Sequence, residues 1–313
     1  MIGKHSTTRR VISSKLNQAV PTGTSCERWR KSIAARRARA KAISAQKAYE
    51  QALEKDANAS DALAGIVNTY LSQNQPQKAI TRIQTQLAKQ PGNSNYHFLL
   101  GAVLFNNKDL KGGAGELQRA VDLDKSNAEA EIKLGQVQTA QGQVDQAIST
   151  YQNYVRDNPR DIRFYILTGE LYESKKDWEK AKDMYQKVLQ IQPDNPLASN
   201  NLAYVMLQEG GNVDMALSMA QVARRGMPQS ANAADTLGWA YYKKGAYASA
   251  LDLFKEAVKL NKDNSDEAVF HYHLGLAYSK TDQRNLAKQQ FERALKINPS
   301  FSDADDARRL LSE

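Results

Sequence analysis

Cysteine and long apolar runs are almost absent from this sequence of 313 residues. The single cysteine, Cys26, excludes a disulfide within the chain and a metal cluster held by cysteines. No run of about 18 apolar residues occurs, so no transmembrane helix is expected. Phosphate-binding loops, dinucleotide fingerprints, nucleophile elbows and zinc motifs are missing as well. We therefore expect a protein that is not an enzyme, with no cofactor and no small-molecule substrate.

A period of 34 residues organises most of the chain. A small residue returns at successive spacings of 34, 34, 34, 34, 35, 34 and 37 residues. The members of this column are Ala45, Ala79, Gly113, Ala147, Ala181, Ala216, Ala250 and Ala287. A fixed period of this length indicates a stack of structural repeats.

The copy that begins at Ala268 shows the pattern most clearly. Gly275 and Tyr278 occupy its positions 8 and 11, and Phe291 and Pro299 occupy positions 24 and 32. Small residues at positions 8 and 20 let two helices approach, large residues at 11 and 24 fill the space beside them, and proline ends the second helix. This pattern resembles the tetratricopeptide repeat (TPR) family. The resemblance implies an all-α fold, a right-handed α-solenoid of stacked antiparallel helix pairs, and a role as a scaffold in protein–protein interaction.

The period also predicts how the chain is divided. A half-repeat that keeps only its second helix is expected over residues 43–59, and a capping helix over residues 302–313. The seven predicted repeats span residues 60–93, 94–127, 128–161, 162–195, 196–230, 231–267 and 268–301.

Residues 1–42 hold the basic character of the chain. They contain eleven Lys or Arg and one acid, whereas the remainder has 32 basic and 33 acidic residues. Several interpretations stay open: a transit peptide, an export signal suggested by Thr8-Arg9-Arg10 or by residues 23–26, a truncated or mis-started gene, or a tail that docks on nucleic acid or an anionic membrane. An apolar signal core is missing, so a cytoplasmic location is the default expectation.

Positions 2, 5, 9 and 12 of the first helices are expected to face a concave groove, because positions 4, 7, 8 and 11 point into the core. Exposed Trp and Tyr are frequent binding hot spots, and Asn can both donate to and accept from a peptide backbone. We therefore expect a peptide or partner segment as the ligand. His97 and His271 fall at position 4, so we interpret them as packing residues. The groove residues predicted are Asn200, Tyr204, Asp235, Trp239, Tyr242, Tyr272, Asn68 and Phe105.

Within the TPR family, the chain resembles bacterial TPR lipoproteins of the PEP-CTERM/exosortase exopolysaccharide system. The resemblance covers residues 196–313 and implies a role in bacterial exopolysaccharide or envelope assembly. The motifs that carry it are Asn200-Asn201-Leu202-Ala203-Tyr204, Asp235-Thr236-Leu237-Gly238-Trp239 and Tyr272-His273-Leu274-Gly275.

Overall fold

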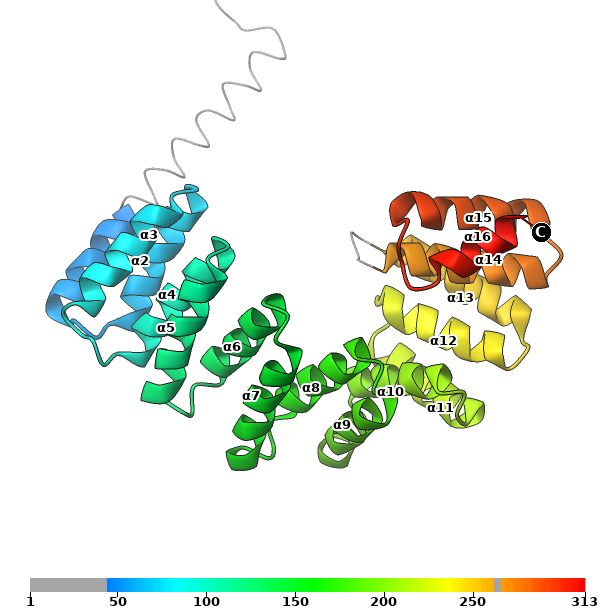
Figure 1. Ribbon diagram of the computed structural model, residues 1–313, viewed down its shortest axis with the longest axis horizontal. Coiled ribbons are helices and arrows are strands. Elements are labelled where there is room, and N and C mark those ends of the chain that lie inside the picture. Colours follow the sequence, from blue (N-terminus) through cyan, green and yellow to red (C-terminus); the bar gives the residue numbers. More distant parts are fainter. Residues whose placement is uncertain (1–43, 262–265, 313) are drawn as a thin grey trace, which may run out of the picture. The chain divides into compact units, whose positions relative to one another are not determined.

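The structure, a computed structural model, describes residues 44–261 and 266–312 (Figure 1). All regular secondary structure in these two ranges is helical, which confirms the predicted all-α class. The expectations for residues 1–42, including the nucleic-acid or membrane tail, lie outside the described residues. Within the described ranges, no helix has the length and apolar character needed to span a bilayer.

The described residues form two compact units, divided between Ala130 and Glu131. In the first unit, a helix over residues 44–55 precedes two helix pairs. Leu63, Ile83 and Tyr96, from three successive helices, are fully buried in its core. The helices of these pairs are α2 (Ser60–Ser72), α3 (Pro76–Leu87), α4 (Ser94–Asn106) and α5 (Leu110–Leu123).

The second unit continues the same alternation of first and second helices, beginning within α6. Each second helix packs on the first helix of its own pair and on that of the next, and one core cluster extends from α7 to α12. The final helix packs against α15 (Figure 1), and its Ala304 and Ala307 are buried in one cluster with Phe291 and Ala294. The helices are α6 (Ala128–Ala140), α7 (Val144–Asp157), α8 (Ile162–Ser174), α9 (Trp178–Ile191), α10 (Pro196–Gln208), α11 (Val213–Gly226), α12 (Ala231–Lys243), α13 (Tyr247–Leu260), α14 (Glu267–Lys280), α15 (Arg284–Ile297) and α16 (Ala304–Ser312).

Polar side chains cap the starts of many helices. At each of these starts, a side-chain oxygen accepts a hydrogen bond from a backbone N–H in the first helical turn, and such a cap stabilises a helix by about 1 kcal/mol. Four of these residues lie between successive pairs and three lie between the two helices of one pair, so they help to set both kinds of helix boundary from the sequence. The capping residues are Asn93, Asp109, Asp161, Asp177, Asn195, Asn212 and Ser230.

The turn inside each pair depends on one residue with a left-handed backbone. This residue is the fifteenth of its repeat in all seven pairs, and glycine supplies it three times, at Gly142, Gly210 and Gly245. The other four turns force a side-chain-bearing residue into the same region, at a cost of about 1 kcal/mol each. Those residues are Asn74, Lys108, Lys176 and Asp282, with φ between 55° and 70°.

In four of the described pairs, the two helices meet where an aromatic ring rests on a glycine. A Cβ added to Gly135 would lie 2.3 Å from the ring of Tyr151, and one added to Gly275 would lie 2.5 Å from the ring of Phe291. Gly169 and Gly238 stand in the same relation to rings on their own second helices. Glycine at position 8 is therefore required because the side chain at position 24 occupies the space of its Cβ.

This close approach predicts opposite effects for two glycines of one helix pair. Gly101→Ala would place a Cβ 2.6 Å from the buried Leu117, so we expect a loss of about 1–3 kcal/mol of unfolding free energy from overpacking. Gly115 faces open space inside α5, so Gly115→Ala should gain about 0.5–1 kcal/mol through helix propensity. Urea unfolding followed by circular dichroism measures both changes, and effects of the same sign would contradict this account.

Candidate functional site

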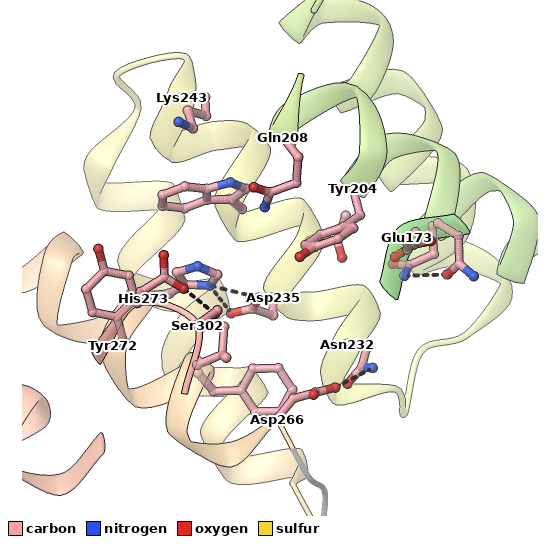
Figure 2. A pocket seen from close by; sticks show the side chains of 17 residues that line it. Glu173, Tyr204, Gln208, Asn232, Asp235, Lys243, Asp266, Tyr272, His273 and Ser302 are labelled. Atoms are coloured by element: carbon pink, nitrogen blue, oxygen red, sulfur yellow. Dashed lines mark hydrogen bonds and ion pairs between the residues drawn. The ribbon is translucent and has the colours of Figure 1, made fainter. Parts of the chain in front are cut away.

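A single cavity of about 510 Å³ lies against the first helices of four consecutive pairs in the second unit (Figure 2). Its walls come from α8, α10, α12 and α14 and from the turn before α16. Most of the lining side chains are polar, which suits hydrogen-bonded recognition better than the binding of an apolar molecule. They are Glu173, Asn200, Asn201, Tyr204, Gln208, Asn232, Asp235, Thr236, Trp239, Lys243, Asp266, Val269, Phe270, Tyr272, His273, Ser302 and Asp303.

Five of the predicted groove residues line this cavity: Asn200, Tyr204, Asp235, Trp239 and Tyr272. The structure corrects their expected exposure. Asn200 and Asp235 are each only 7% exposed and Tyr272 only 6%, so these side chains at position 5 do not stand on an open surface. Neighbouring first helices contact each other along α10, α12 and α14, and Asp235 at position 5 meets His273 of the next first helix.

The other three predicted residues lie elsewhere. Tyr242 is not among the lining residues and stacks on Trp239, with ring centroids 5.1 Å apart and planes 8° apart. Asn68 is exposed on α2 and Phe105 is half-buried on α4, both in the first unit. The cavity therefore draws only on groove residues of the C-terminal repeats.

The sequence reasoning missed the side chains at positions 6 and 13. His273 lies at position 6, and Gln208 and Lys243 lie at position 13 of their repeats. His273 is buried, and its Nδ1 lies 3.0 Å and 2.9 Å from the two carboxylate oxygens of Asp235 on the preceding first helix. An acid at position 5 followed by a histidine at position 6 of the next repeat was the signal that could have revealed this pair.

Trp239 is held at the cavity by aromatic stacking. Its ring lies 4.4 Å from the imidazole of His273, with the planes 13° apart. The ammonium group of Lys243 lies 4.7 Å from the centre of the same indole, within range of a cation–π interaction. Tyr272 has a different role, because its hydroxyl donates to Asp306 over 2.8 Å and so ties α14 to α16. Of these residues, Trp239 is positioned to present an indole edge to a ligand.

Two buried polar atoms at the cavity have no hydrogen-bond partner. Asn200 donates through Nδ2 to Asn201 over 3.3 Å, but its Oδ1 accepts no hydrogen bond. The indole Nε1 of Trp239 likewise donates to nothing. A third such atom, Ser199 Oγ, belongs to a residue that does not line the cavity. An unpaired buried donor or acceptor costs about 1–3 kcal/mol, so these groups do not stabilise the free protein.

Glu173 brings a buried carboxyl group to the cavity wall. Burial raises its pKa to about 7, Glu170 raises it as well, and the hydrogen bond from the Tyr185 hydroxyl acts in the opposite direction. Clusters of three or more His, Cys, Asp or Glu side chains that could hold a metal ion do not occur in residues 44–261 and 266–312. The chemistry that this cavity offers is therefore hydrogen bonding, stacking and charge.

Three family profiles match the chain. The profile described as "Cytochrome c-type biogenesis protein H TPR domain" matches residues 46–198. Profiles described as "TPR repeat" and "Tetratricopeptide repeat" match residues 238–282 and 268–301. Together they cover most of the helix pairs described above.

Curated relatives match over part of their length. Protein O-mannosyl-transferase TMTC1 of Homo sapiens is 27% identical over 168 residues, which is 53% of this chain and 19% of that protein. Mitochondrial import receptor subunit TOM70 of Rattus norvegicus is 24% identical over 140 residues, which is 45% of this chain and 23% of that protein. The chain thus spans about a fifth of the length of these relatives.

The fold is also that of solved TPR structures. A tetratricopeptide repeat protein from Parabacteroides merdae has a TM-score of 0.61 at 16% identity, covering 85% of this chain and 98% of that one. Proteins of this fold generally serve as non-catalytic scaffolds for protein interaction. From the repeat pattern, the helix pairs and these matches, we conclude that the chain belongs to the tetratricopeptide repeat family.

Proposed function

We propose that this protein is a non-catalytic scaffold that binds a segment of another protein in the cavity lined by α8, α10, α12 and α14. The observation that carries the proposal is the pair of unpartnered atoms, Asn200 Oδ1 and Trp239 Nε1, in one cavity. One is an acceptor and the other a donor, and every peptide unit offers a complementary N–H and C=O. Each atom has less than 1 Å² of accessible surface, so a bound segment would satisfy both groups once the two side chains turn toward the cavity.

Several groups at this cavity lower the stability of the free protein, and this supports the same proposal. Asn200 and Trp239 each hold an unpaired buried atom, and Glu173 is a carboxyl group whose ionised form is disfavoured by burial. Groups that destabilise a fold and gather in one cavity are typical of sites kept for binding. The alternative role of these side chains, in packing alone, gives no reason for leaving hydrogen-bonding groups unpaired.

The biological setting stays a prediction from the sequence. The resemblance to lipoproteins of the exopolysaccharide system suggests that the bound segment belongs to a partner in exopolysaccharide or envelope assembly. A docking role for the basic residues 1–42 on nucleic acid or membrane is the alternative. It requires binding that weakens steeply with salt and disappears when residues 1–42 are deleted.

Substitutions that remove the unpaired atoms should separate binding from stability. Asn200→Ala removes the unpaired acceptor, and Trp239→Phe removes the unpaired donor but keeps a ring to stack on His273. Peptides selected from a random phage-displayed library on the full-length protein should bind each variant about fivefold more weakly, because one hydrogen bond is worth about 1 kcal/mol. The unfolding free energy of Asn200→Ala should stay unchanged or rise by up to about 1 kcal/mol.

Gln186→Ala provides the matched control, because Gln186 is exposed on the second helix α9 and does not line the cavity. Its peptide affinities should equal those of the unsubstituted protein. Selected peptides that bind Asn200→Ala, Trp239→Phe and Gln186→Ala equally well would show that the cavity is not the binding site.

The raised pKa of Glu173 predicts that the stability of the protein depends on pH. Its pKa is about 7 in the folded protein, against 4.5 for the ordinary side chain, so the folded state holds the proton more tightly than the unfolded state. The contribution of Glu173 to the free energy of unfolding is therefore fully present below about pH 4.5. It falls as the pH rises and is lost above about pH 7. Glu173→Gln keeps an acceptor for Tyr185 without this loss, so at pH 8 it should exceed the original protein by on the order of 2 kcal/mol.

Urea unfolding of both proteins between pH 5 and pH 8 measures this difference as a function of pH. The two stabilities should be similar near pH 5 and should diverge as the pH rises. Parallel profiles would mean that Glu173 titrates normally in the folded protein.

A further inference from the structure

The cavity carries far more negative than positive charge. Four carboxylates line it: Glu173 on α8, Asp235 on α12, Asp266 directly before α14, and Asp303 directly before α16. Among the described residues that line it, Lys243 is the single lysine or arginine. The acids come from four separate elements, so the negative charge is not confined to one wall, and Figure 2 shows Glu173, Asp235 and Asp266 on different sides of the cavity.

Neutral donors hold two of these acids. Asp303 accepts from the Ser302 hydroxyl over 2.5 Å, and Glu173 accepts from the Tyr185 hydroxyl. These two hydrogen bonds orient the carboxyl groups without placing a positive charge beside them. Asp235 differs, because it is paired with His273.

The negative charges of the four acids together affect the pKa of Tyr204. Burial, followed by the charges of Glu173, Asp303, Asp235 and Asp266, raises the pKa of its phenol to about 12. Each of the four carboxylates thus disfavours a further negative charge at the cavity wall. A positively charged group at the same place would be favoured by the same field.

Asn200 is the independent sign that a hydrogen-bond donor belongs in the cavity. Only 7% of the residue is exposed, and it lines the cavity. Its Oδ1 is an acceptor without a hydrogen-bond partner. A guanidinium group offers five N–H donors and an ammonium group three, and both carry a positive charge. Such a group would satisfy an acceptor such as Asn200 Oδ1 and offset the carboxylates together.

From these observations we infer that the segment bound in this cavity presents an arginine or lysine side chain, held by the carboxylate of Asp303 and by Glu173, whose ionised form the bound cation stabilises. The inference rests on the proposed function and specifies the chemistry of the partner. Lys243 stays over the Trp239 ring, so it flanks the site without filling it.

Blocked pentapeptides test the inference directly on the full-length protein. All residues are alanine except the central one, which is Arg, Lys, Gln or Glu in the four probes. Binding is followed by amide-proton NMR at the indole N–H of Trp239, whose signal is assigned by its loss in Trp239→Phe. At low salt, the Arg and Lys peptides should bind about tenfold more tightly than the Gln peptide, with the Glu peptide weakest. Raising the salt to about 1 M should reduce the difference, because exposed charges are then screened.

Asp303→Asn supplies the site-specific arm of the test. It should lower the preference for Arg over Gln, measured as the ratio of the two peptide affinities, at least about threefold. Asp183→Asn is the matched control, because Asp183 is exposed on α9 and does not line the cavity. It removes the same charge from the protein and should leave the preference intact.

The outcomes separate this inference from the proposed function. Equal binding of all four peptides at the Trp239 signal would overturn the charge preference and leave peptide binding standing. Tightest binding of the Glu peptide would also overturn it and would assign recognition to Lys243. Failure of every peptide to shift the Trp239 signal would count against both proposals.

Discussion

In four of the seven described helix pairs, the contact between an aromatic ring and a glycine sets the geometry on which the rest of the pair depends. With Tyr151 on Gly135, or Phe291 on Gly275, the second helix approaches so closely that even a methyl group on the first helix would collide with the ring. Because of this contact, one side of the first helix packs against the second helix of its own pair. The side chains at positions 5, 6, 9 and 13 are then left for the neighbouring first helices and for the cavity between them. The binding surface is thus a consequence of how each pair closes.

Much of this fold was predictable because its local causes are visible in one repeat. Glycine at position 8, the ring at position 24 and proline near the end of the second helix each act over a single helix pair, and the period displays them repeatedly. The left-handed turn residue was less visible. Three of its seven occurrences are glycine, but Lys108 and Lys176 give no hint of the same backbone, because the closure of the helix pair imposes it against their own preference.

The cavity was predictable only in part, because it depends on contacts between repeats. Counting along a helix identified Asn200, Tyr204, Asp235, Trp239 and Tyr272, which do line one cavity. It could not show that Asn200 is buried with an unpaired oxygen, since that depends on the packing of neighbouring first helices. It also could not bring His273 to Asp235, because the two residues stand in different repeats and at different positions within them.

A repeat array can tolerate such a cavity because its stability is the sum of local contributions. Each pair interacts mainly with its neighbours, so unpaired groups at α10 and α12 lower the stability of those pairs without weakening distant ones. The core beside the cavity is correspondingly large, with Tyr185, Leu202 and Ala203 nearly fully buried behind it. On the other side, Tyr272 anchors α16 through Asp306, and Phe301 packs against the Tyr272 ring. Well-packed pairs therefore flank the polar cavity, and they allow Asn200, Trp239 and Glu173 to remain less stable than packing alone would make them.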